Sequence, residues 1–243
     1  FARRYLTVHR INYNTAYHTK FPEAIKKLYG VPKMFTWPIV RWFHSNSNMI
    51  LTTTKSMVEE LKSHGFGNNI VTWTRGVDRE IFKPTERKVN EKLVLLNVGR
   101  VSKEKNLEQF YKMNYPNCQK IQVGDGPMLK EYIKRYPDVN FVGTKCSAEL
   151  AHYYQQADVF VFPSRCETFG LVMIEAMACG TPVAAYPVQG PLDVIAEGVT
   201  GCMHNDLSKA VESAKHLDRE NVFVRSHIWS WKSAWEIFRD NLA

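Results

Sequence analysis

Residues 158–187 leave this chain little freedom of fold, because they read as a strand, a loop, a helix and a second strand in close succession. The continuous apolar run 159–162 predicts a short strand buried on both faces. Apolar residues at helical spacing predict a helix over 170–179, which Gly180 and Pro182 then end. With a further strand over 183–186, these elements form one βαβ unit, whose crossover we expect to be right-handed.

The polar loop inside this unit, residues 164–168, joins the carboxyl end of a parallel strand to the first turn of a helix. Ligands of open α/β sheets bind at this position, and unpaired N–H groups together with the helix dipole stabilise anions there. The loop carries Glu167, and the helix carries Glu175 among apolar neighbours, where a charge is costly without a partner. A sugar or ribose diol would offer two hydroxyl donors to such an acid. The alternative is a solvated helix face with an ordinary loop acid.

A second loop with a charged sequence follows a buried strand predicted over 92–98. It begins at Gly99, which allows the backbone to approach a ligand, and it contains Arg100 and Lys105. Two cations on one short loop could hold a diphosphate and stabilise it as it leaves. A solvated basic loop is the alternative.

Two more predicted strands end in glycine. The strand over 120–123 runs into the turn Gly124-Asp125-Gly126-Pro127, and the strand over 140–143 ends at Gly143. The turn is not a complete dinucleotide-binding fingerprint, so it does not by itself predict a phosphate site. We interpret it as part of the lining of a ligand pocket.

The spacing Glu167-x7-Glu175, with Thr-Phe-Gly-Leu after the first acid and Ala-x3-Gly-Thr-Pro-Val after the second, resembles the donor site of retaining glycosyltransferases of family 4. The turn at 124–127 and the loop at 99–106 are similar to the same family. Together these stretches cover most of the chain from Tyr17 onward. The resemblance implies an α/β protein of GT-B architecture, in which two Rossmann-like, doubly wound domains face each other across a cleft.

The resemblance also implies roles for individual residues in binding a nucleoside-diphosphate sugar. Arg100 and Lys105 would grip the phosphates of the donor, Glu167 would hold the hydroxyls of its sugar, and Glu175 would hold the ribose diol. The nucleobase would meet the backbone after the strand at 140–143. The other donor-binding residues implied are Gly99, Gly124, Gly143, Phe169, Gly170 and Leu171.

His18 ends a strand predicted over 14–18, where it could touch a ligand. A lone histidine is more often a structural hydrogen-bonding residue, but in the family a histidine in the corresponding Tyr-His-Thr sequence faces the donor sugar. We find no convincing covalent nucleophile, so the resemblance implies same-face attack assisted by the leaving phosphate, with retention. The sequence has no Asp-x-Asp motif and no histidine cluster, and we expect neither a metal nor another cofactor.

The resemblance divides the chain into three segments. Residues 1–84 would be a partial N-terminal, acceptor-side domain, residues 85–225 the nucleotide-sugar domain, and residues 226–243 a helix that crosses back to the first domain. The string Gly-Val-Asp-x3-Phe-x-Pro at 76–84 joins the two domains in similar proteins. A full first domain would need roughly a hundred residues before Phe1. We therefore expect a truncated first domain, with a partner chain or an oligomer covering its incomplete sheet.

Composition narrows the partners and the compartment. A net charge of +8 favours anionic partners, but we find no nucleic-acid recognition motif, so we do not predict nucleic-acid binding. No apolar run approaches the roughly 18 residues that span a bilayer, so any membrane contact would be peripheral. Five cysteines without a Cys-x-x-Cys pair favour a reduced, cytoplasmic protein, whose membrane contact would be at the inner face.

The acceptor is less well defined than the donor, which could be a UDP- or a GDP-sugar. The run at 185–195 resembles bacterial members that glycosylate diacylglycerol-type lipids, so we expect a lipid or glycan acceptor. Residues 30–44 mix aromatic residues with Lys33 and Arg41; they could meet lipid headgroups, or their aromatic side could pack into the core. An alternative function is a sugar-nucleotide-binding module, or an inactive subunit that needs a partner.

Overall fold

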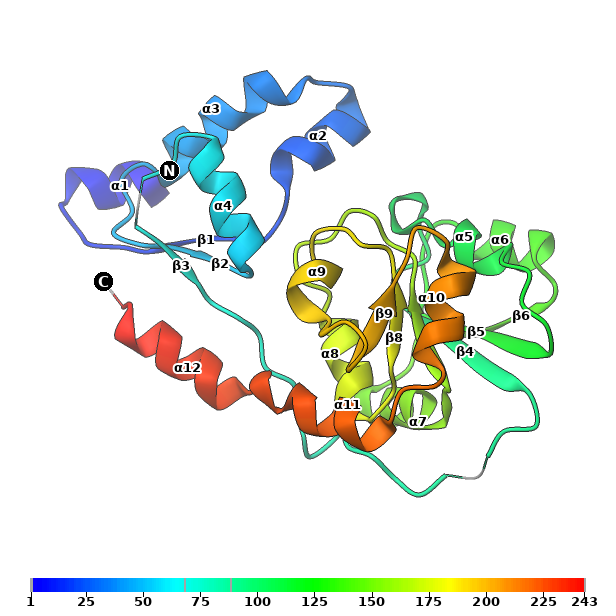
Figure 1. The fold of residues 1–243 in the computed structure, drawn as a ribbon. Helices are drawn as coiled ribbons and strands as arrows, with labels where there is room; N and C mark the ends of the chain where they lie inside the picture. Colours follow the sequence, from blue (N-terminus) through cyan, green and yellow to red (C-terminus); the bar gives the residue numbers. More distant parts are fainter. Residues whose placement is uncertain (1, 68, 88, 243) are drawn as a thin grey trace. The chain divides into compact units, whose positions relative to one another are not determined.

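The computed structural model of the chain describes residues 2–67, 69–87 and 89–242. It contains two compact units: a larger one, Val77–Ser230, and a smaller one that combines the chain up to Gly76 with the segment from Trp231 onward. Each unit has its own parallel sheet (Figure 1). The buried apolar residues form two clusters in the larger unit and one in the smaller unit. The first boundary between the units lies after Gly76, and Val77 and Phe82 are buried in the core of the larger unit.

The sheet of the larger unit is fully parallel, with the strand order β6-β5-β4-β7-β8-β9. Starting from the middle, the chain adds two strands on one side of β4 and then three on the other, which is the doubly wound order of nucleotide-binding sheets. The strands are β4 (Leu93–Val98), β5 (Cys118–Val123), β6 (Val139–Gly143), β7 (Val159–Phe162), β8 (Val183–Ala185) and β9 (Gly201–Met203).

Helices cover both faces of this sheet and create two cores. One core contains buried residues of α7 (Ser147–Gln156), α8 (Leu171–Ala178) and α11 (Arg219–Arg225). The other contains buried residues of α5 (Glu108–Tyr111), α6 (Leu129–Arg135) and α10 (Leu207–Ala214). The remaining short helices of the unit are η1 (Lys103–Lys105), α9 (Pro191–Val194) and η2 (Ser226–Ile228).

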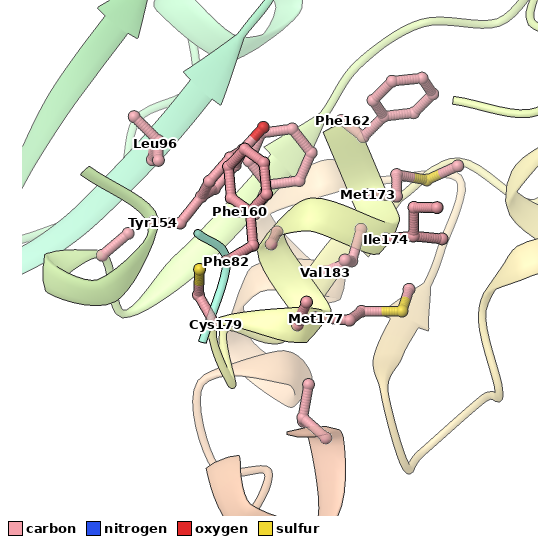
Figure 2. Packing of buried hydrophobic residues seen from close by; sticks show 14 of the residues in the cluster. Phe82, Leu96, Tyr154, Phe160, Phe162, Met173, Ile174, Met177, Cys179 and Val183 are labelled. Atoms are coloured by element: carbon pink, nitrogen blue, oxygen red, sulfur yellow. The ribbon is translucent and has the colours of Figure 1, made fainter. Parts of the chain in front are cut away.

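The predicted strand-helix-strand unit is present as β7, α8 and β8. Along β7, Val159 and Val161 point into one core while Phe160 and Phe162 point into the other, as the two-residue period of a strand requires. Figure 2 shows α8 contributing Met173, Ile174 and Met177 to the packing next to Phe160. This apolar surround on both faces explains why the sequence of β7 is a continuous hydrophobic run.

The smaller unit has a three-stranded parallel sheet in the order β1-β2-β3, with only three residues in each strand. Its core gathers Tyr17, Trp37 and Phe66 around the sheet. The strands and helices of this unit are α1 (Ala2–Val8), β1 (Thr15–Tyr17), α2 (Phe21–Tyr29), α3 (Lys33–His44), β2 (Ile50–Thr52), α4 (Lys55–Ser63), β3 (Ile70–Thr72) and α12 (Trp231–Asp240).

Two helices of the smaller unit expose large aromatic side chains. Of the Phe and Trp residues of α3 only Trp37 is buried, whereas Phe35, Trp42 and Phe43 are exposed, so most of the aromatic residues of 30–44 do not pack into the core. On α12, Trp231 and Trp235 are exposed, and the helix is attached through Trp73, whose ring lies 5.2 Å from that of Phe238 and whose Nε1 donates to the carbonyl of Ala234 at 3.0 Å. Within the described residues, no helix has the length and apolar character needed to cross a bilayer.

Candidate active site

The loops that carry most of the predicted site residues leave the carboxyl ends of β4 and β7, which are neighbouring strands. After β4 the chain turns to the face covered by α5, and after β7 it turns to the opposite face, covered by α8. The two loops therefore diverge from one point. In open α/β sheets this point is where ligands bind.

Lys105 and Glu167, which are 62 residues apart in sequence, meet at this point. The Nζ atom of Lys105 lies 2.7 Å from Oε2 of Glu167, and both side chains are partly buried. The second carboxylate oxygen of Glu167 accepts a hydrogen bond from the backbone N–H of Thr168 at 3.2 Å. The structure thus joins a cation predicted for phosphate with an acid predicted for sugar hydroxyls.

The loop after β4 is held against the loop after β7 by the residue that follows Lys105. Asn106 ends the 3-10 turn η1 in the left-handed region, with φ of 56°, and its amide donates to the carbonyl of Pro163 at 3.0 Å. Within the sheet, the amide of Asn97 donates to the carbonyl of Val161 at 2.8 Å. Because these bonds fix both loops, the ammonium and carboxylate groups are positioned before any ligand binds.

The predicted glycines lie on neighbouring strand ends. Gly124 has φ of 124°, and a Cβ at this position would lie 2.1 Å from the carbonyl oxygen of Gly99. The N–H of Gly124 donates to the carbonyl of Gly143 at 2.8 Å. Only glycine permits this close approach of the backbones after β4, β5 and β6.

The start of α8 lies beside Glu167. Gly170 is its N-cap, with φ of 85°, and a Cβ there would lie 2.7 Å from Cε of Met173 and 3.6 Å from Cγ of Glu167. Phe169 is buried, with its ring 5.3 Å from that of Trp229, so it can meet a ligand only through its backbone. Leu171 is exposed. The first N–H groups of a helix have no partner within the helix, so the start of α8 stays a predicted anion-binding position.

Glu175 lies one turn further along α8, and its carboxylate accepts a hydrogen bond from the Tyr154 hydroxyl at 3.0 Å. Tyr154 is fully buried on α7, next to Phe82 (Figure 2). Burial raises the pKa of Glu175, and the hydrogen bond from Tyr154 opposes part of that shift. The sequence offered no signal for Tyr154, which reads as one aromatic residue on an apolar helix face.

Arg100 is exposed at the start of the loop after β4. A further cation, which the sequence reasoning missed, lies at the same end of the sheet. The guanidinium of Arg165 lies 3.7 Å from the ring centroid of Tyr186, which follows β8 and lines a hollow of about 310 Å³ together with Lys112 of the segment after α5. Arg165 could have been predicted as a site residue because it lies two residues before Glu167 in the same loop.

His18 belongs to the smaller unit, where it follows β1. Its Nδ1 lies 2.6 Å from Nη2 of Arg75, which follows β3, and its ring lies 5.5 Å from that of Trp73. Burial, and then the charge of Arg75, lower the pKa of His18 to about 4. The imidazole is therefore neutral at neutral pH, and because Arg75 donates to Nδ1, its proton is carried by Nε2. Arg75 directly precedes the string at 76–84, and nothing in the sequence indicated its contact with His18.

Among the residues that the structure describes, no three His, Cys, Asp or Glu side chains are grouped so that they could hold a metal ion. The positive charge recorded near Glu167 comes from Lys105. The larger unit thus combines a doubly wound nucleotide-type sheet with a paired cation and acid at its ligand-binding edge.

The family model of glycosyl transferases group 1 matches residues 78–219, more than half of the chain. The protein belongs to this family. Its α/β fold is that of GT-B glycosyltransferases: it resembles the structure of sucrose-phosphate synthase from Thermosynechococcus elongatus with a TM-score of 0.80 and 22% identity, over 96% of this chain and 69% of that one. It also resembles Anabaena HepE in complex with UDP-glucose, with a TM-score of 0.76 and 16% identity, over 97% of this chain and 73% of that one. The predicted fold class is confirmed.

Curated relatives are similar over much of the chain. The sulfoquinovosyl transferase of Arabidopsis thaliana is 33% identical over 84% of this chain, and a GDP-mannose-dependent alpha-mannosyltransferase of Corynebacterium glutamicum is 34% identical over 69%. The alpha-monoglucosyldiacylglycerol synthase of Acholeplasma laidlawii is 29% identical over 82%. This chain covers 45%, 43% and 54% of the lengths of these three proteins, so it spans about half of each.

Proposed function

We propose that the protein is a retaining glycosyltransferase, which moves a sugar from a nucleoside-diphosphate donor to a hydroxyl group of an acceptor. The observation that carries the proposal is the ion pair of Lys105 with Glu167 at the switch point of the larger sheet. Family membership supports the enzyme class and the sugar-nucleotide donor. The proposal adds the stereochemistry, the roles of the residues and the acceptor.

Charge stabilisation at the leaving group is the main task of the site. Lys105, Arg100 and the N–H groups at the start of α8 would bind the departing diphosphate, and they supply fixed positive charge where other enzymes use a divalent metal. Because Lys105 has three donors, it can keep its contact with Glu167 while it binds a phosphate oxygen. Glu167 would accept hydrogen bonds from hydroxyls of the donor sugar.

The reaction breaks the bond from the anomeric carbon to the phosphate oxygen. The acceptor oxygen bonds to that carbon on the same face, and its proton passes to the departing phosphate. Glu167 is an unsuitable covalent nucleophile because its carboxylate is already engaged by an ammonium group at 2.7 Å. A single same-face step therefore accounts better for the roles of these residues than a glycosyl-enzyme intermediate does.

Two residues would orient the donor. Glu175 would hold the ribose diol, with its carboxylate oriented by the hydrogen bond from Tyr154. His18, from the smaller unit, would contact the sugar as a neutral donor through Nε2, because its low pKa prevents it from acting as a cation at neutral pH. Such a contact positions the sugar without adding charge to the site.

We infer that the acceptor is a lipid or glycan and that the enzyme works in the cytoplasm, at the inner face of a membrane. The name of the Acholeplasma relative, a diacylglycerol-glycosylating synthase, supports a lipid acceptor. So does the exposure of aromatic residues on α3. Both supports are independent of the donor site.

The test begins with the donor. Thermal-shift measurements with UDP- and GDP-sugars should single out one donor, because stabilisation is about 2.7 kcal/mol when the ligand is present at 100 times its Kd. NMR of the product of that donor should then show the anomeric configuration of the donor retained. An inverted product would reject the retaining mechanism. Donor binding without transfer or hydrolysis would favour the alternative function, a sugar-nucleotide-binding subunit.

A further inference from the structure

Helix α3 exposes an unusual number of large apolar side chains. The exposed fractions are 70% for Met34, 60% for Phe35, 63% for Ile39, 60% for Trp42 and 49% for Phe43. With side-chain areas of about 150–250 Å² for aromatic residues, the five together expose on the order of 500 Å² of apolar surface. A patch of this size on one short helix usually marks an interaction site.

Three of the exposed side chains, Phe35, Ile39 and Trp42, lie opposite the face that holds α3 in the unit, and Met34 and Phe43 flank that face. Thr36, Trp37, Val40 and His44 are buried, and they recur at the spacing of one helix face. The apolar residues 35, 39 and 42 form a second stripe on the other side. A surface helix normally places polar residues on the side that faces away from the core. Helix α3 instead has two apolar faces, and the core of the smaller unit buries only one of them.

Positive charge is concentrated in the same part of the chain. Residues 1–44 contain eight Lys or Arg and a single acid, Glu23, which is ion-paired with Lys33. Lys26 and Lys27 are exposed on α2, which packs against α3. The guanidinium of Arg3 lies 4.3 Å from the ring of Trp42. A hollow of about 420 Å³ beside α3 has Arg41 and Trp42 in its lining.

We propose that these groups form a docking surface for an anionic lipid bilayer, in which the stripe enters the headgroup region and the cations meet lipid phosphates. The α3 surface consists of Met34, Phe35, Ile39, Trp42 and Phe43, together with Arg3, which lies over Trp42, and Lys26 and Lys27 on the adjoining helix α2. Aromatic residues combined with cations suit a membrane interface, and the near absence of acids favours negatively charged lipid. This proposal rests on the proposed function, in which the acceptor is a lipid. The binding of vesicles can nevertheless be measured without a donor and without catalysis.

The test measures flotation of the whole chain with vesicles of phosphatidylcholine, with and without phosphatidylglycerol. We expect binding to the anionic vesicles, which weakens as the ionic strength rises. Phe35→Ser/Ile39→Ser should reduce the partition coefficient at least about tenfold through lost apolar area. Lys26→Gln/Lys27→Gln should reduce it about 25-fold, since each cation near an anionic surface contributes about a factor of five. Trp235→Ser is the matched control: Trp235 is 57% exposed on α12, and its loss should leave binding within about twofold.

Circular dichroism should show unchanged folding for all three variants, because every replaced side chain is exposed. Failure of the unmodified chain to bind anionic vesicles would overturn the proposal. So would binding that survives Phe35→Ser/Ile39→Ser. Gel filtration that shows a dimer which the same substitutions dissociate would assign the surface to a second copy of the chain instead. Unchanged donor-induced thermal stabilisation in the variants would show that the donor site is intact, so that the two proposals succeed or fail separately.

Discussion

The two sheets of this molecule differ in how completely they cover their apolar residues. In the larger unit all four residues of β7 and five of the eight residues of α8 are buried, and helices cover both faces of the sheet. In the smaller unit three short strands support α3, which leaves five of its seven large apolar side chains exposed and buries only Trp37 and Val40. Apolar area that is buried on folding stabilises the fold, whereas area left outside is available for binding.

Charge divides the chain in the same way. Of the 32 basic and 24 acidic residues, eight basic residues and one acid lie in residues 1–44, which leaves 24 basic and 23 acidic residues for the rest. The net charge of +8 is therefore almost entirely a property of the first 44 residues. In the larger unit positive and negative charges nearly balance, and cations such as Lys105 are ion-paired, whereas the first 44 residues of the smaller unit carry a large excess of positive charge.

The largest expected effect tests whether the stability of the larger unit depends on the close backbone contact between Gly124 and Gly99. Gly124→Ala should destabilise it by about 4 kcal/mol, because the new Cβ would lie 2.1 Å from the carbonyl oxygen of Gly99 at a φ that only glycine adopts readily. Gly143→Ala is the control: φ is 72°, but no atom lies within 4 Å of the new Cβ, so the cost should be only about 1–2 kcal/mol. Urea unfolding followed by circular dichroism measures both. Equal losses would mean that the contact between the two loops is not what fixes them.

The next prediction concerns chemistry rather than folding. Lys105→Ala should lower kcat by about 10²–10³-fold with a much smaller loss of donor affinity, because the cation acts mainly on charge that develops at the leaving group. Lys103→Ala, an exposed cation in the same 3-10 turn, should change kcat less than about twofold. Steady-state kinetics and donor titration separate the two quantities. Equal losses of kcat and of donor affinity for Lys105→Ala would mean that Lys105 binds the donor but does not stabilise the leaving group in the transition state.

The sequence predicted the larger unit well because its signals are local. A strand buried on both faces is a continuous apolar run, and β4 and β7 were placed within one residue of their ends. The strand β9 and the helix α11 were not predicted, since β9 has only three residues after a turn and α11 has a single buried residue. Lys105 and Glu167 could each be predicted as site residues because they lie in loops after buried strands. Their ion pair could not be predicted, because it depends on β4 and β7 being neighbours in the sheet.

The smaller unit was harder to predict because its residues take their roles from tertiary contacts. The partnership of His18 with Arg75 joins the ends of β1 and β3, which are far apart in sequence. The pattern of α3 is compatible with both a core helix and an exposed one, and only the packing of Trp37 shows which side faces inward. The sequence shows that a residue is apolar, but not whether its side chain is buried in the core or lies on the surface.

Low pH should destabilise the smaller unit more than the larger unit. Burial lowers the pKa of His44 to about 4, and burial with the charge of Arg75 does the same for His18. Because an unfolded histidine has a pKa near 6.5, the unfolded smaller unit binds more protons, and stability is lost as the pH falls from about 6.5 towards 4. For the buried His44 the loss is about 3 kcal/mol at pH 4, since each pKa unit corresponds to about 1.4 kcal/mol. The four histidines of the larger unit, His152, His204, His216 and His227, are all exposed.

Tryptophan fluorescence can follow this loss, since Trp229 is the one tryptophan of six that lies in the larger unit. Thermal melts monitored by tryptophan should shift downward between neutral pH and about pH 4.5, while circular dichroism retains a transition of the larger unit. His44→Gln should flatten the shift, and His9→Gln, at an exposed position, should not. Coincident melting of both signals at low pH would show that the two units unfold together.

The smallest expected effect concerns the buried carboxylate of the larger unit. Tyr154→Phe removes the hydroxyl that donates to Glu175 and should lower the free energy of unfolding by about 1–2 kcal/mol, because a partly buried acceptor loses its partner. Tyr153→Phe, at the neighbouring position of α7, keeps a partly buried ring against the same core and should change it by less than about 0.5 kcal/mol. Urea midpoints at constant m-value measure the difference. If the two substitutions were equal, the larger unit would owe little to this hydrogen bond, and the orientation of Glu175 would have to come from the ligand.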